Sequence, residues 1–152
     1  MSVCQICGRA VKSKNGVIAH HGFKRPGQGW QTASCYGAKY RPYEVAKDAL
    51  ENYLPEVKKW MKIKQESLNS LLDCPPDKLD AVIKLDASGK MKSVVYTKPD
   101  NFDKNDNQHY VQPHSYAGEY RSKVRHLRIQ IAEMVQDIGY LTQRIADWKG
   151  EA

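Results

Sequence analysis

The chain has 152 residues, a formal charge of +7 and a mean hydropathy of −0.68. A polar chain of this length holds one modest domain, or a small module with a helical body, which disfavours an enzyme built around a deep pocket. Residues 1–43 contain no acidic residue and carry the whole net charge, because basic and acidic residues balance in the remainder. Such a basic region attracts polyanions, either nucleic acid or an acidic protein.

The first 35 residues contain a Cys-x2-Cys pair, a histidine doublet and a third cysteine. A knuckle of this spacing turns both thiolates to one side of a tight loop, while further ligands come from elsewhere in the chain. We therefore predict one structural Zn²⁺ per chain, bound by Cys4, Cys7, His21 and Cys35. Four protein ligands leave no position for a catalytic water.

The choice of His21 over His20 depends on local geometry. The run 17–23 predicts a short strand, and its alternating faces direct only one of two adjacent imidazoles toward the metal. Gly22 beside His21 also permits close backbone approach. His20 stays open as the alternative ligand.

No signal peptide and no apolar segment of membrane-spanning length is recognisable in the sequence. We therefore expect a cytoplasmic protein without membrane contact. In that reducing compartment cysteines bind metal rather than form disulfides.

Five basic residues of the module are candidates for contact with nucleic acid or another acidic partner: Arg9, Lys12, Lys14, Lys24 and Arg25. Aromatic residues lie among them, namely Phe23, Trp30, Tyr36 and Tyr40. Such rings stack on bases or form the hydrophobic core of a small module, and the sequence leaves both interpretations open.

Three segments resemble the amino-terminal finger of short uncharacterised proteins from bacteriophages and prophages. They are Cys4-Gln5-Ile6-Cys7-Gly8-Arg9, the run from His21 to Gly27, and Cys35-Tyr36-Gly37-Ala38 with the following Pro42-Tyr43-Glu44. The resemblance covers about the first third of the chain. It implies four zinc ligands, with the histidine of the His-Gly step as the nitrogen ligand, and an origin in a mobile element. The protein would then act in the bacterial host cytoplasm.

A helix is expected from about residue 44 to 72, since Pro42 and Glu44 suit a helical amino terminus and apolar residues follow at four-three spacing. Pro55 interrupts this pattern and predicts a kink or restart. Cys74 precedes two prolines that end the helix, and we interpret it as a small half-buried residue rather than a metal ligand.

Two β-rich runs within residues 81–97 predict a hairpin, joined by a turn that ends in Gly89. A polar loop follows at about 98–116. Its histidines, His109 and His114, have no partner at ligand spacing, so we interpret them as exposed loop residues.

The last segment repeats apolar residues at four-three spacing over four heptads, which predicts a coiled-coil helix. Its seam comprises Val124, Leu127, Ile131, Met134, Ile138, Leu141 and Ile145, flanked by Tyr120 and Trp148. The β-branched residues at one seam position favour a two-stranded homodimer. Pairing with the 44–72 helix in an antiparallel helical hairpin is the competing solution, and we place it slightly ahead, because the apolar residues from Leu50 to Leu71 otherwise have nothing to bury against.

The predicted fold is α+β, with a zinc-finger module at 1–43 and a helical coiled-coil body at 44–152 that carries the inserted β-hairpin. The predicted function is a non-enzymatic zinc-finger protein that grips a polyanionic partner. The alternative is a phage-encoded inhibitor that docks on a bacterial defence or regulatory protein, with zinc as a purely structural element. A metal-dependent nuclease is the enzymatic alternative, but the chain lacks the second histidine and asparagine expected on a following helix.

Overall fold

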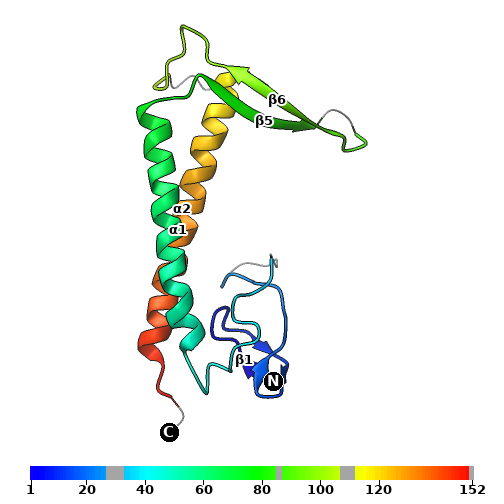
Figure 1. The fold of residues 1–152 in the computed structure, drawn as a ribbon, viewed down its shortest axis with the longest axis vertical. Coiled ribbons are helices and arrows are strands. Elements are labelled where there is room, and N and C mark those ends of the chain that lie inside the picture. Colours follow the sequence, from blue (N-terminus) through cyan, green and yellow to red (C-terminus); the bar gives the residue numbers. More distant parts are fainter. Residues whose placement is uncertain (27–32, 85–86, 107–111, 151–152) are drawn as a thin grey trace. The chain divides into compact units, whose positions relative to one another are not determined.

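The computed structural model describes residues 1–26, 33–84, 87–106 and 112–150, and the chain forms two compact units (Figure 1). Unit 1 comprises Met1–Met61 with Glu133–Ala152, and unit 2 comprises Lys62–Ala132. The two helices, α1 (Asp48–Asp73) and α2 (Tyr116–Asp147), each contribute one part to each unit. The boundary expected at residue 43 falls inside unit 1, because the amino-terminal module packs there against the ends of both helices.

Four two-residue strands pair antiparallel in the first eighteen residues: β1 (Ser2–Val3) with β2 (Ala10–Val11), and β3 (Ser13–Lys14) with β4 (Val17–Ile18). Asn15 and Gly16 connect β3 to β4 with φ angles of 53° and 77°. A two-residue hairpin turn needs this left-handed backbone at both positions, and Asn-Gly adopts it readily. The strand expected over 17–23 is shorter than predicted, and Gly22 forms only an isolated bridge with Ser34.

α1 begins at Asp48, later than the start expected near Glu44. Residues 43–45 form a turn instead, in which the amide of Ala46 donates to the carbonyl of Pro42. The Glu44 carboxylate accepts a hydrogen bond from the amide of Val3 (3.0 Å). It therefore stabilises the amino-terminal module rather than the start of α1.

Pro55 lies inside α1, which is continuous from Asp48 to Asp73, so the helix does not restart there. Proline removes one hydrogen bond of the helical ladder and crowds the preceding turn. Leu54 and Val57 on either side of it pack into the core of unit 1, and this packing stabilises the helix across the gap.

Unit 1 has its own hydrophobic core, in which Cys4, Cys7 and Cys35 pack with residues of both helices. From α1 come Ala49, Leu50 and Val57, and from α2 come Leu141 with the half-buried Ile138. The seam predicted on α2 faces inward along its length: Val124 and Leu141 are buried, and Leu127, Ile131, Met134, Ile138 and Ile145 are half-buried.

Unit 2 contains the predicted hairpin, formed by β5 (Lys78–Lys84) and β6 (Met91–Thr97). The pairing begins three residues earlier than expected, with Lys78 opposite Thr97 and Lys84 opposite Met91 (Figure 1). Leu79 is buried against residues of both helices in the second core, which also holds Leu68, Tyr116, Tyr120 and Val124.

Residues 98–106 and 112–115 contain no helix or strand, as predicted for the polar loop. Phe102 anchors this segment, since its ring meets Tyr116 and Tyr120 edge-on at 4.9 and 5.1 Å between centroids. His114 is exposed, whereas His109 lies outside the described residues. Cys74, which directly follows the last residue of α1, is exposed rather than half-buried as predicted.

The fold therefore has two helices and small antiparallel sheets, a mixed α/β arrangement with a Cys/His cluster near the amino terminus. Neither helix has an apolar stretch sufficient to cross a membrane, within the ranges described above.

Candidate metal centre

Three sulfurs and one imidazole nitrogen meet in unit 1. The ligand atoms of Cys4, Cys7, His21 and Cys35 all lie within 4.8 Å of one another. The Cys4 and Cys35 sulfurs are 3.8 Å apart, and Cys7 Sγ lies 3.4 Å from His21 Nε2. Tetrahedral zinc with Zn–S bonds of about 2.3 Å places its sulfurs about 3.8 Å apart. The cluster thus has the dimensions of a four-coordinate metal site.

The first knuckle is a tight loop closed by backbone hydrogen bonds. The amide of Gly8 donates to the Cys4 carbonyl (3.1 Å), and the amide of Cys4 donates to the Arg9 carbonyl (2.9 Å). Gly8 adopts φ +69°, a conformation in which a side chain is strained, so the loop needs glycine here. The loop of residues 35–38, which we call the second knuckle, closes in a similar manner, with the amide of Ala38 donating to the Cys35 carbonyl.

Each sulfur also receives a backbone N–H. The Cys7 amide donates to Cys4 Sγ, the Arg9 amide to Cys7 Sγ and the Gly37 amide to Cys35 Sγ. Hydrogen bonds to a thiolate stabilise its charged form, the form that binds metal. Each of these backbone hydrogen bonds favours the thiolate form of the sulfur that accepts it.

His21 is held in the tautomer that a metal requires. Its Nδ1 lies 2.8 Å from the carbonyl oxygen of Ala19, and a carbonyl can only accept, so Nδ1 carries the proton. Nε2, which lies 3.4 Å from the Cys7 sulfur, is then left with a free lone pair. His20 instead bonds the hydroxyl of Ser34 at 2.8 Å, so the structure places His21 and not His20 in the cluster.

The three buried thiols shift one another's pKa in opposite directions. Hydrogen bonding from Cys35, followed by that from Cys4, lowers the pKa of Cys7 well below its ordinary value. Hydrogen bonding to Cys4 and Cys7, together with burial, raises the pKa of Cys35. One thiolate therefore forms readily, and the further negative charges need a cation beside them. A metal ion bound by these residues would supply that cation.

Gly37 lies against the cluster from the side of the second knuckle. A Cβ atom at this position would be 2.5 Å from Cys4 Sγ and 3.2 Å from Cγ1 of the buried Ile6. No real Cβ contact is that short, so the site has space for glycine only. The constraint is steric, since Gly37 does not have a positive φ.

Gln5, inside the first knuckle, connects the metal site to α1. Its side chain is fully buried and makes three hydrogen bonds. Nε2 donates to the Arg41 carbonyl and to Asp48 Oδ1, and Oε1 accepts from the amide of Ala49, each at 2.8 Å. The amide of Ala49 belongs to the first turn of α1, where no helical carbonyl is available to it. Gln5, a residue of the first knuckle, therefore caps the amino terminus of α1.

Arg144 makes the corresponding connection to α2. Its guanidinium donates to the carbonyls of Gln5 (2.9 Å) and Cys4 (3.3 Å) and lies 3.9 Å from the centre of the Tyr43 ring. The hydroxyl of Tyr43 donates in turn to the Arg144 carbonyl, and Trp148 Nε1 donates to the Tyr43 carbonyl. The knuckle is thus fixed to both helices within unit 1.

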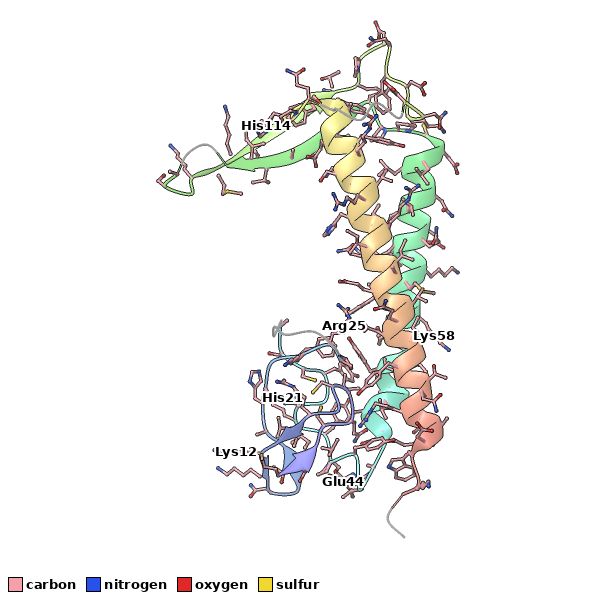
Figure 2. The ribbon with its side chains drawn as sticks, turned by 180° about the vertical axis from the view of Figure 1, so that it is seen from behind. Lys12, His21, Arg25, Glu44, Lys58 and His114 are labelled. Carbon is pink, nitrogen blue, oxygen red and sulfur yellow. The ribbon has the colours of Figure 1, made fainter. Side chains whose placement is uncertain are left out.

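Two of the basic residues predicted to contact a partner are used inside the molecule. Arg25 forms a bidentate ion pair with Asp137 (2.9 Å for each hydrogen bond) and a second ion pair with Glu133 (3.3 Å) (Figure 2). The hydrogen bonding to Asp137 raises the pKa of Arg25. Arg9 donates to the Gly22 carbonyl. Lys24 is half-buried, whereas Lys12 and Lys14 are exposed.

Exposed cations gather around β4. Lys14 belongs to the strand β3, and the Lys12 carbonyl accepts from the amide of Ala19. On the other side, the amide of Lys39 donates to the Ile18 carbonyl. Three neighbouring segments thus carry a set of exposed residues that we call the basic surface: Lys12, Lys14, Lys39 and Arg41. Lys39 and Arg41 were not among the five residues predicted to contact a partner.

Sequence reasoning also missed Gln5, Gly37 and Arg144 as supports of the site. A polar residue between two knuckle cysteines is a usable signal for Gln5, because it cannot be buried without partners. Gly37, two residues after a ligand cysteine, is a weaker signal. Arg144 has none, since its contacts are with residues more than 100 positions away.

Comparisons with protein-family models, with curated proteins and with solved structures gave no match for this chain. The resemblance of the first third to phage and prophage finger proteins therefore stays a prediction.

Proposed function

We propose that Cys4, Cys7, His21 and Cys35 bind one structural Zn²⁺ and that the module so formed presents a basic surface to a polyanionic partner. The observation that carries the zinc proposal is the convergence of four ligand atoms within 4.8 Å, with the histidine held in the metal-binding tautomer. Thiolate and imidazole ligands in tetrahedral dimensions are typical of zinc.

The proposed role of the zinc is structural. Four protein ligands complete a tetrahedral shell and leave no site for a reacting water. Structural zinc contributes about 10–16 kcal/mol to the folding of finger peptides, more than the small core of such a module supplies. Removal of the metal with a chelator should therefore unfold the amino-terminal module, and an unchanged circular dichroism spectrum after complete zinc removal would argue against the proposal.

The partner proposal depends on the basic surface. Lys12, Lys14, Lys39 and Arg41 are exposed, and no carboxylate pairs with them in the part of the chain that the structure describes. Because Arg25 is already paired with Asp137, its positive charge is largely neutralised inside unit 1. The proposal therefore moves the main contacts from Arg9 and Arg25 to the residues around β4.

The experiment is a titration of fluorescent duplex and single-stranded oligonucleotides over a range of salt concentrations. Four phosphate contacts predict a slope of log affinity against log salt of about −3.6 for duplex and about −2.8 for single strands. Lys12→Ala with Lys14→Ala should flatten the duplex slope by about 1.8. The control, Lys58→Ala with Lys59→Ala, removes two exposed lysines of α1 and should leave the slope unchanged.

Three results are informative. A complex with a cellular partner that survives nuclease digestion but not salt identifies an acidic protein rather than nucleic acid. Equal effects of the two double variants would show that the basic surface has no special role. The absence of any oligonucleotide binding at micromolar protein and low salt would exclude nucleic acid as the partner.

We also infer that the seam of α2 is a coiled-coil surface with α1 as its partner. Within unit 1 Leu50 and Val57 share a core with Leu141, and within unit 2 Leu68 shares one with Val124. This favours the intramolecular pairing over a homodimer. Light scattering separates the two, because a monomer is expected and a stable dimer would contradict the inference.

A further inference from the structure

An open groove of about 870 Å³ lies along α2 in unit 2. One wall is the stretch of α2 from Tyr120 to Ala132, and the other is formed by Leu72 near the end of α1 and by residues 104–106. The groove belongs wholly to unit 2 and shares no residue with the metal centre or the basic surface.

Its cationic side consists of arginines at helical spacing. Arg121, Arg125 and Arg128 are separated by four and three residues, so they project from the same side of α2. Arg121 donates to the Asp106 carbonyl, which fixes it at one end of the groove. Arg125 and Arg128 are exposed, and neither forms an ion pair within the described residues.

The groove also has an apolar side. Ile129 is 47% exposed although it lines the groove, and Ala132, one turn further along α2, is exposed as well. Val124 and Leu72 contribute apolar surface deeper in the groove. The exposed Ile129 beside Arg125 and Arg128 is surface that a partner of matching chemistry would cover.

We propose that this groove binds an acidic amphipathic segment of a partner protein. Carboxylates of that segment would pair with Arg125 and Arg128, because the planar guanidinium forms bidentate hydrogen bonds with a carboxylate. Apolar side chains from the same segment would cover Ile129 and Ala132. Charge complementarity and the apolar wall together select such a segment as the occupant.

Nucleic acid fits this groove less well. Among the described residues that line it, the one aromatic side chain is that of Tyr120, which is 3% exposed and therefore offers no ring on which a base can stack. A phosphate backbone would pair with the arginines but leave the apolar wall facing sugars and water. This proposal does not depend on the function proposed for the zinc module, because its residues and its expected ligand are different.

The test uses the full-length, zinc-loaded chain and a fluorescent helical peptide of about 18 residues, about 27 Å long, with leucines on one face and glutamates beside them. We expect micromolar binding by anisotropy that weakens with added salt. Arg125→Glu with Arg128→Glu should lower the affinity at least about tenfold. The matched control, Lys58→Glu with Lys59→Glu, makes the same charge change elsewhere and should have less than about a twofold effect.

A second pair of variants tests the apolar wall. Ile129→Ala should lower the affinity for the peptide about three- to tenfold, as expected for loss of a side chain that the peptide partly covers. Ile63→Ala, which changes an isoleucine of similar exposure (48%) outside the groove, should leave the affinity unchanged. Both isoleucines are exposed, so neither variant should disturb folding, which circular dichroism checks.

Several results would overturn the proposal. One is the absence of peptide binding at about 100 μM. Another is equal affinity for the original peptide and for a peptide with glutamine in place of every glutamate. A third is a peptide affinity that does not change with Arg125→Glu and Arg128→Glu. A single-stranded oligonucleotide that binds more tightly than the peptide, and loses affinity with Arg125→Glu and Arg128→Glu, would assign the groove to nucleic acid instead. If oligonucleotide binding is lost only with Lys12→Ala and Lys14→Ala, the result concerns the basic surface and leaves the groove proposal intact.

Discussion

Replacing Gly37 with alanine tests whether the cysteine cluster is as tightly packed as the structure indicates. The new Cβ would lie 2.5 Å from Cys4 Sγ, more than 1 Å inside a normal contact. Neither neighbour can yield easily, because the sulfur is a proposed zinc ligand and Ile6 is 1% exposed. Overpacking of this kind costs about 1–3 kcal/mol, which corresponds to about a 5- to 150-fold loss of zinc affinity if metal binding and folding of the module are coupled.

The assay is a competition titration of zinc against a chromophoric chelator, with thermal unfolding measured in parallel. Gly139→Ala is the control: it adds a Cβ in α2 where no atom lies within 4 Å, and it should stabilise the helix by up to about 1 kcal/mol. If Gly37→Ala binds zinc and melts like the wild-type protein, the close approach of Gly37 to the Cys4 sulfur is not real, and the geometric argument for the cluster loses its main steric support.

Three further predictions concern residues of unit 1. Gln5→Leu leaves the Ala49 amide and the Arg41 carbonyl without their buried partner and should lower the free energy of unfolding by about 2–4 kcal/mol, measured by denaturant titration. Ile138→Asp places a charge in the half-buried seam and should cost several kcal/mol, whereas Val135→Asp, at a residue 55% exposed on the same helix, should cost less than about 0.5 kcal/mol. Arg25→Ala should lower stability by about 1 kcal/mol and leave the salt slope of oligonucleotide binding unchanged, since Arg25 is paired with Asp137. A flattened slope for Arg25→Ala would restore it as a partner contact.

The parts of the fold that the sequence predicted are those governed by local pattern. The hairpin of β5 and β6 and the inward-facing seam of α2 follow from alternation and four-three spacing, which short-range geometry enforces. The cluster of three cysteines and His21 was also anticipated, because Cys-x2-Cys spacing restricts where the thiolates can point. The turn between β3 and β4 was not predicted, although Asn15-Gly16 carries an equally local signal for it.

The remaining features depend on contacts between distant residues, which one sequence does not reveal. α1 starts at Asp48 because Gln5, more than 40 positions earlier, supplies the hydrogen bond for its first turn. Arg25 is an ion-pair partner of a helix that begins at Tyr116, so its charge alone suggested a binding role. The exposed groove beside Arg125 and Arg128 arises where α2 meets residues 104–106, and composition gave no indication of it.

The central claim is that one zinc ion is held by Cys4, Cys7, His21 and Cys35, and the zinc content of purified protein tests it most directly. Elemental analysis of the wild-type chain should give one zinc per chain. His20→Ala should retain full occupancy, because His20 bonds Ser34, whereas His21→Ala should lose zinc or bind it much more weakly. A metal-free wild-type protein, or a His21→Ala variant that keeps full occupancy while His20→Ala loses it, would contradict the assignment.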